Sequence, residues 1–256
     1  MGGAERSARK RRQQAGARAV SRARGGGGLS RKTIVAGVAV VVLAVLVIGG
    51  VIWTNASKNS TAGQTIAPQT AAAALDSPTE RQGATVVSGS ATAKVKLTMY
   101  ADFLCPICGQ FQSAYGTQLE QQIQAGTVQM TYRMIPLLNQ KSDPPGYSLA
   151  SANAALCAAD QGKFTPFHDS LYKSQPEEGQ RGYDNAQLIK LGTDLGITSP
   201  DFATCVNNGT YNAQINADYQ QISADPNFQG TPTVLHNGQS VNWSDPNWLT
   251  NLINAA

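Results

Sequence analysis

Histidine is nearly absent from this sequence, and cysteine is scarce. The two histidines are His168 and His236, and the four cysteines contain a single close pair, Cys105 and Cys108. A zinc site that uses a C-x-x-C pair needs a second close pair, or histidines at short spacing. The sequence offers neither, since Cys157 lies 49 residues beyond Cys108. The close pair is therefore interpreted as a redox motif, and no metal site is expected.

Basic residues are few outside the beginning of the chain. Residues 1–32 contain ten lysines and arginines against one acidic residue, a net charge of +9. The remaining residues contain ten basic and fifteen acidic side chains, a net charge of −5. Because the basic character belongs to a tail that cannot bury a core, residues 1–33 are predicted to be a disordered cytoplasmic tail. A basic surface for nucleic acid is not expected.

Charged side chains are missing from residues 34–53, which are mostly Val, Ala, Ile and Leu. A helix of this length crosses the hydrocarbon core of a membrane, and Trp53 would anchor it at the interface. The preceding positive charge predicts a single-pass protein of the cell membrane, with a cytoplasmic N-terminus and the rest of the chain outside. A cleaved signal peptide is the alternative, although residues 54–56 form a weak cleavage site.

One stretch carries the chemistry. Apolar and polar residues alternate over residues 94–99 and predict a strand, and apolar residues at helical spacing follow over 111–123. The order of strand, C-x-x-C and helix places Cys105 at a helix N-terminus, where free N–H groups and the helix dipole favour a thiolate. Pro106 suits the first helical turn, and Cys108 would be the resolving thiol.

The remaining sequence predicts a folded domain over residues 84–256. Few large apolar residues occur in 54–83, which reads as a flexible extracytoplasmic linker. A strand is predicted at 84–89 and another at 128–134, the second parallel to the strand before the cysteines. Only helical signals occur over about 147–225, and a hairpin on an Asn-Gly turn follows at 233–241.

The sequence resembles the DsbA-like branch of the thioredoxin superfamily, in its membrane-anchored actinobacterial form. The resemblance covers roughly residues 84–255. It is carried by Asp102-Phe103-Leu104-Cys105-Pro106-Ile107-Cys108, by residues 154–164 and by Gly230-Thr231-Pro232-Thr233. It implies an α/β class, with a thioredoxin-like fold that contains an inserted helical block and is preceded here by one transmembrane helix.

The resemblance also implies roles for residues far from the cysteine pair. Pro232 is expected in a cis-proline loop that faces Cys105, where the backbone of Thr231 would bind an extended substrate. Cys157 and Cys205 either remain buried free thiols or pair with each other. An oxidising compartment favours the pair, and similar actinobacterial proteins carry a structural disulfide in this block.

Four residues near the cysteines are candidates for further roles. Asp102 either relays protons to the resolving thiol or satisfies backbone N–H groups. Phe103, Leu104 and Ile107 are candidates for an apolar rim, with core packing as the alternative for Phe103. Ile107 also stands where the best-known oxidase of the family has histidine. Without an imidazole to stabilise the thiolate, a weaker oxidising power is expected.

The predicted function is an extracytoplasmic thiol–disulfide oxidoreductase, most simply an oxidase that introduces disulfides into exported proteins. The expected partners are unfolded or reduced exported proteins, and the resemblance implies a quinone-coupled reoxidant of the DsbB or VKOR kind in the membrane. No cofactor is expected. Two alternatives remain, a reductase or isomerase on the same fold and a non-catalytic module that binds unfolded exported proteins.

Overall fold

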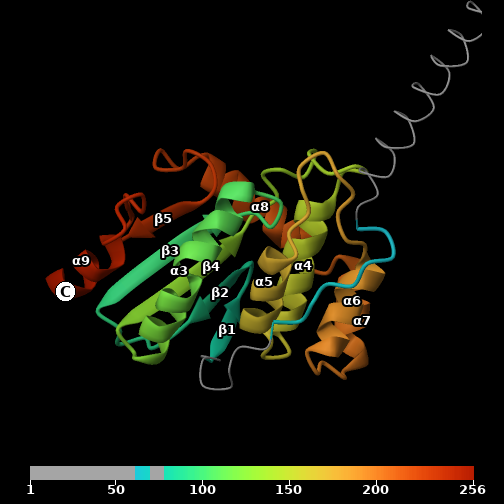
Figure 1. The fold of residues 1–256 in the computed structure, drawn as a ribbon, viewed down its shortest axis with the longest axis horizontal. Helices are drawn as coiled ribbons and strands as arrows, with labels where there is room; N and C mark the ends of the chain where they lie inside the picture. The colour runs from blue at the N-terminus through green and yellow to red at the C-terminus, as the bar shows by residue number, and fades with distance from the viewer. Residues whose placement is uncertain (1–60, 70–77) are drawn as a thin grey trace, which may run out of the picture. The chain divides into compact units, whose positions relative to one another are not determined.

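The computed structural model describes residues 61–69 and 78–256, which build a mixed six-stranded sheet with helices around it (Figure 1). The strand order is β1-β2-β4-β3-β5-β6. Only β3 and β4 pair in parallel, and every other neighbouring pair is antiparallel. The strands are β1 (Thr79–Gln82), β2 (Thr85–Ser88), β3 (Val95–Ala101), β4 (Val128–Met134), β5 (Thr233–His236) and β6 (Gln239–Ser240).

The central strands follow the period-2 pattern of the sequence. In β3, Val95, Leu97 and Met99 are buried and Lys96 is exposed, while β4 alternates buried and half-buried residues throughout. Helix α3 (Pro106–Gln124) connects the two strands, as expected for a parallel pair that needs a crossover. The predicted strand–helix–strand unit is therefore confirmed, and the C-x-x-C pair lies where β3 ends and α3 begins.

Five helices stand between β4 and β5 and form the helical block. They are α4 (Tyr147–Ala159), α5 (Phe164–Lys173), α6 (Asn185–Asp194), α7 (Pro200–Asn208) and α8 (Asn212–Ser223), and α9 (Trp248–Ala255) follows β6. Helix α6 begins with a complete capping box between Asp184 and Gln187, and the Ser199 hydroxyl caps α7. The apolar core continues from the sheet into this block. A smaller cluster packs α8 against β3 and β5, and it consists of Tyr100, Ile135, Ile222 and Leu235.

The domain begins earlier than the sequence predicted, because part of the predicted linker is folded onto it. Residues 79–82 form β1, which pairs with β2. Residues 61–69, drawn in cyan in Figure 1, run beside the helical block, and Ile66 there is only 1% exposed. The Gln187 side chain in α6 donates to the carbonyls of Thr61 and Gln64, both at 2.7 Å. One buried isoleucine and a few hydrogen bonds between side chains of the domain and the segment's backbone hold residues 61–69, although their composition is that of a linker.

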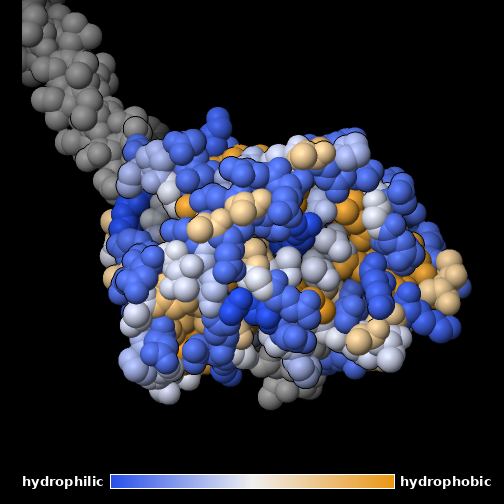
Figure 2. Space-filling model, turned by 180° about the vertical axis from the view of Figure 1, so that it is seen from behind, coloured by the Kyte–Doolittle hydropathy of each residue, from blue (hydrophilic) through white to orange (hydrophobic). Residues whose placement is uncertain are grey.

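The predicted tail at 1–33, the predicted membrane span at 34–53 and residues 54–60 lie outside the described residues. Within 61–69 and 78–256, none of the helices has the length and apolar character needed to cross a membrane. The face of the domain seen in Figure 2 is mostly hydrophilic, with apolar side chains in several small areas.

Candidate active site at the cysteine pair

Cys105 is the N-cap residue of α3, and its sulfur caps the helix. The backbone N–H of Cys108 donates to Cys105 Sγ at 3.4 Å, and Pro106 occupies the first helical position. Both cysteines are free thiols and both are buried. The sequence predicted this placement, because a strand followed by C-P-x-C and a helix leaves little freedom in where the first cysteine lies.

The pKa values of the two thiols are shifted in opposite directions. The hydrogen bond from the Cys108 thiol is the largest cause that lowers the pKa of Cys105 to about 6, and Thr231 and the backbone N–H groups of Cys108 and Ile107 lower it further while burial opposes them. Burial raises the pKa of Cys108 well above its ordinary value, and its hydrogen bond to Cys105 adds to the rise. Cys105 is thus suited to be the nucleophile and leaving group, and Cys108 stays protonated.

The loop before β5 brings Thr231 to the cysteine. The Thr231–Pro232 peptide bond is cis, and the Cys105 thiol donates to the Thr231 carbonyl at 3.3 Å across 126 residues of sequence. Thr231 and Pro232 are both half-buried. The structure therefore places Cys105, Cys108, Thr231 and Pro232 in one site.

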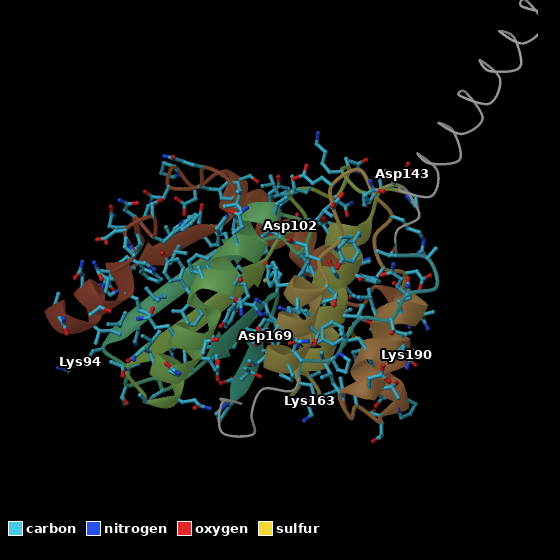
Figure 3. The ribbon with its side chains drawn as sticks, viewed as in Figure 1. Lys94, Asp102, Asp143, Lys163, Asp169 and Lys190 are labelled. Atoms are coloured by element: carbon cyan, nitrogen blue, oxygen red, sulfur yellow. A yellow bond between two sulfur atoms is a disulfide. The ribbon has the colours of Figure 1, made fainter. Side chains whose placement is uncertain are left out.

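Asp102 lies at the end of β3 beside the first turn of α3 (Figure 3). Its two carboxylate oxygens accept the backbone N–H groups of Leu104, at 2.8 Å, and of Leu138, at 2.7 Å. Burial is the main cause that raises the pKa of Asp102 to about 6. These contacts favour the interpretation in which Asp102 satisfies backbone N–H groups and holds two loops together. The proton-relay role stays a prediction.

The expected apolar rim is reduced to one residue. Phe103 and Leu104 are fully buried in the core, so the rim role is wrong for Leu104, and core packing, the alternative given for Phe103, is confirmed. Both lie just after β3, and the Phe103 ring packs against His168 and Tyr172 of α5. Ile107 is 43% exposed and is the one exposed large hydrophobic side chain among the described residues. It lies in the first turn of α3, next to the reactive sulfur.

Cys157 in α4 and Cys205 in α7 form a disulfide, with an S–S distance of 2.01 Å and Cα atoms 6.0 Å apart. Asn153, one turn before Cys157, donates to the carbonyls of Cys205 and Val206 at 3.4 Å. This pair therefore joins two helices of the block, and neither of its cysteines belongs to the redox site.

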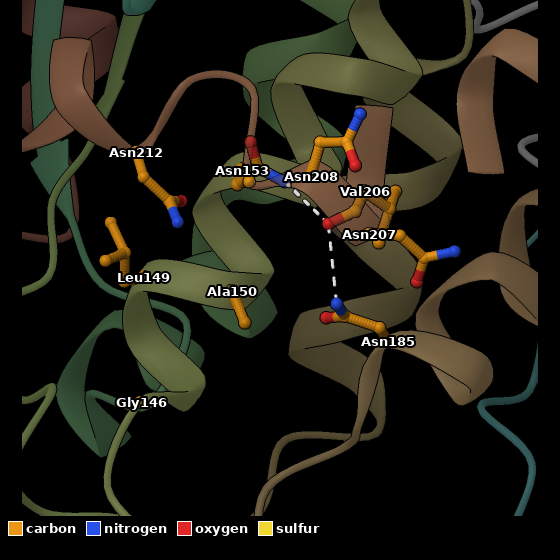
Figure 4. Close-up of a pocket in the computed structure, with 10 residues that line it drawn as sticks. Gly146, Leu149, Ala150, Asn153, Asn185, Val206, Asn207, Asn208 and Asn212 are labelled. Carbon is orange, nitrogen blue, oxygen red and sulfur yellow. Dashed lines mark hydrogen bonds between the residues drawn. The ribbon is translucent and has the colours of Figure 1, made fainter. Parts of the chain in front are cut away.

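An asparagine-rich cleft of about 190 Å³ lies between α4, α6, α7 and α8 (Figure 4). Asn153 and Asn185 both donate to the Val206 carbonyl at its edge. No residue that lines the cleft belongs to α3 or to the loop at Thr231. The cleft is therefore separate from the cysteine chemistry.

Within the part of the chain that the structure describes, no group of three or more His, Cys, Asp or Glu side chains is placed to bind a metal ion.

Gln175 is a site residue that the sequence analysis missed. It follows α5, and its side-chain Nε2 donates to the carbonyls of Phe103 and Cys105, both at 2.9 Å. Its partners are backbone atoms about 70 residues earlier in the chain, so neither a motif nor a periodicity signals the contact.

Comparison with known proteins agrees with this geometry. A family model described as thioredoxin matches residues 81–255. The chain is 28% identical over 177 residues to the serine/threonine-protein kinase PknE of Mycobacterium tuberculosis, a match that covers 66% of this chain and 31% of the kinase. The chain thus spans about a third of the length of that relative.

Two solved structures from Mycobacterium tuberculosis are similar over most of the described domain. The reduced form of the disulfide-bond oxidoreductase DsbG has 31% identity and a TM-score of 0.58, and the match covers 66% of this chain and 85% of that one. Reduced DsbA has 29% identity and a TM-score of 0.59, with 68% and 92% covered. The chain belongs to the thioredoxin family, and its folded domain is that of a DsbA-type thiol–disulfide oxidoreductase.

Proposed function

We propose that the protein is an extracytoplasmic oxidase that introduces disulfides into exported proteins. The observation that carries this proposal is the contrast between Cys105, whose pKa is lowered to about 6, and Cys108, whose pKa is raised. A stabilised Cys105 thiolate stabilises the reduced pair, and a couple with a stabilised reduced form is a stronger oxidant.

The reaction begins from the Cys105–Cys108 disulfide. A substrate thiolate attacks Cys105 Sγ, the bond between the cysteines breaks, and its electron pair leaves on the Cys108 sulfur, which takes a proton. A second substrate thiolate then attacks the substrate sulfur of the mixed disulfide and expels Cys105 as a thiolate. The substrate loses two electrons and gains a disulfide, and the enzyme is left as the dithiol.

Substrate binding and reoxidation complete the proposal. The half-buried position of Thr231 before cis-Pro232 supports pairing of its backbone with an extended substrate strand, and exposed Ile107 supports an apolar contact beside it. The basic and apolar segments before residue 54 support anchoring in the cell membrane with the domain outside. There a quinone-coupled membrane partner of the DsbB or VKOR kind would reoxidise the pair.

A redox titration of the full-length protein tests the direction. The Cys105–Cys108 state is followed against a glutathione buffer, and the oxidised protein is mixed with a reduced, unfolded two-cysteine substrate. We expect stoichiometric oxidation of the substrate, its loss in Cys105→Ser, and a more oxidising couple in Ile107→His. A reduction potential of about −270 mV, the value of thioredoxin, would indicate that the protein is a reductase and not an oxidase. Function that survives Cys105→Ser would indicate the binding module instead.

A further inference from the structure

Gln175 contacts the redox centre through the backbone carbonyls of Phe103 and Cys105. It is half-buried in the loop after α5, and both of its amide contacts go to the segment that precedes α3. An amide nitrogen carries two hydrogens, so the two bonds to Phe103 O and Cys105 O use its full donor capacity. The helical block thereby holds the backbone on both sides of the nucleophile.

The carbonyls of Phe103 and Cys105 belong to the segment that leads into α3, and the Cys105 carbonyl takes part in the first turn of that helix. The Cys105 carbonyl also accepts the N–H of Gly109 at 3.2 Å, which is a first-turn hydrogen bond of α3. The same segment is held by Asp102, whose backbone carbonyl accepts the N–H of Cys105 at 3.0 Å. Asp102 therefore fixes the N–H side of this segment and Gln175 fixes its carbonyl side.

Gly109 leaves room for this contact. It lies in the first turns of α3, one residue after Cys108, and a methyl group on its Cα would collide with Oε1 of Gln175. The colliding atom is the far end of a flexible side chain, so the helix can keep its path if the Gln175 amide moves away. A side chain at position 109 would thus displace the amide without changing Gln175 itself.

We propose that Gln175 is a positioning residue of the redox centre, whose amide orients the backbone around Cys105 so that the first turn of α3 faces the sulfur. This inference rests on the proposed thiol–disulfide function, which it deepens by adding the helical block to the site. Loss of the amide removes one hydrogen bond from each of the carbonyls of Phe103 and Cys105, and the N–H groups that stabilise the thiolate are then less firmly held in direction.

The test compares variants of the full-length protein by the pH dependence of iodoacetamide alkylation at Cys105, read by peptide mass spectrometry. In Gln175→Ala we expect the midpoint to rise by about half a pH unit or more, roughly a threefold loss of thiolate on the acid side. Gln112→Ala is the matched control. It removes another glutamine amide that joins α3 to α5, through Asp169 at 2.9 Å, but it leaves residues 103–105 untouched.

Gly109→Ala takes the place of Gln175→Ala if the latter does not fold. Replacing a helical glycine with alanine favours the helix by up to about 1 kcal/mol, and a native circular-dichroism spectrum of this variant separates a raised midpoint from unfolding. A midpoint close to that of the wild type, or an equal rise in Gln112→Ala, would overturn the proposal. Alkylation needs no substrate protein, so this result is independent of whether the wild type oxidises the test substrate.

Discussion

The reactivity of Cys105 should persist at acidic pH, where an ordinary thiol is almost inert. Its pKa of about 6 arises from hydrogen bonds of the Cys108 thiol, Thr231 and the N–H groups of the first helical turn. At pH 6 half of such a thiol is ionised, against about 0.3% of a thiol with a pKa of 8.5. The large difference in thiolate population makes acidic pH the informative range.

The stabilised thiolate is also a weaker nucleophile, and this reduces the advantage. With a Brønsted coefficient of about 0.45, a thiolate whose pKa is lower by 2.5 units is intrinsically about 13-fold less nucleophilic. Cys105 should therefore react with a small disulfide about tenfold faster than a free thiol at pH 6, but only about twofold faster at pH 7. A measurement at neutral pH alone would miss the effect.

The assay follows release of pyridinethione from a dipyridyl disulfide by the reduced full-length protein between pH 4.5 and about 9, a range that spans the ordinary thiol pKa. Cys108→Ala should raise the midpoint, because it removes the largest cause of the lowered pKa. Cys105→Ser should abolish the acid reactivity, since burial keeps Cys108 protonated. A wild-type midpoint near 8.5, or an unchanged profile in Cys105→Ser, would refute this account of the site.

Three further perturbations test other parts of the structure. The folded pKa of Asp102, about 6, lies above its ordinary value, so the folded state holds the proton more tightly; stability should fall as the pH rises from about 4 to 6, and urea unfolding of Asp102→Asn should lack that slope. Replacing Cys157 and Cys205 with alanine should lower the free energy of unfolding by up to roughly 4 kcal/mol for a 48-residue loop while the Cys105 midpoint stays unchanged. Ile66→Ala should lower it by about 2–4 kcal/mol, whereas no change would show that residues 61–69 do not pack.

Features that depend on neighbouring residues could be predicted from the sequence. The strand before the cysteines and the Pro106 start of α3 follow from periodicity and from the chemistry of the first turn. The hairpin follows from Asn237 and Gly238, which adopt φ values of 50° and 77°. Helix α5 begins at Phe164, and its N-cap residue Lys163 makes no side-chain cap hydrogen bond, so the sequence carries no capping signal for this start.

Features that depend on distant partners could not be predicted in this way. Residues 61–69 have the composition of a linker, and their attachment comes from Ile66 and from backbone carbonyls that accept from Gln187. The contacts of Gln175 likewise end on backbone carbonyls, which every residue carries and which therefore leave no trace in the sequence. The proximity of Thr231 to Cys105 was expected only through the family resemblance.

The environment of Cys105 is assembled from segments that meet only in the folded chain. Helix α3 supplies N–H groups, the loop before β5 supplies the Thr231 side chain, and the loop after α5 supplies the amide of Gln175. An unfolded chain keeps none of these contacts, so the Cys105 thiol should return to the pKa of a free cysteine when the tertiary structure opens. Acid reactivity of this one sulfur is therefore a reporter of packing between the sheet and the helical block. It connects the stability of the domain directly to its redox chemistry.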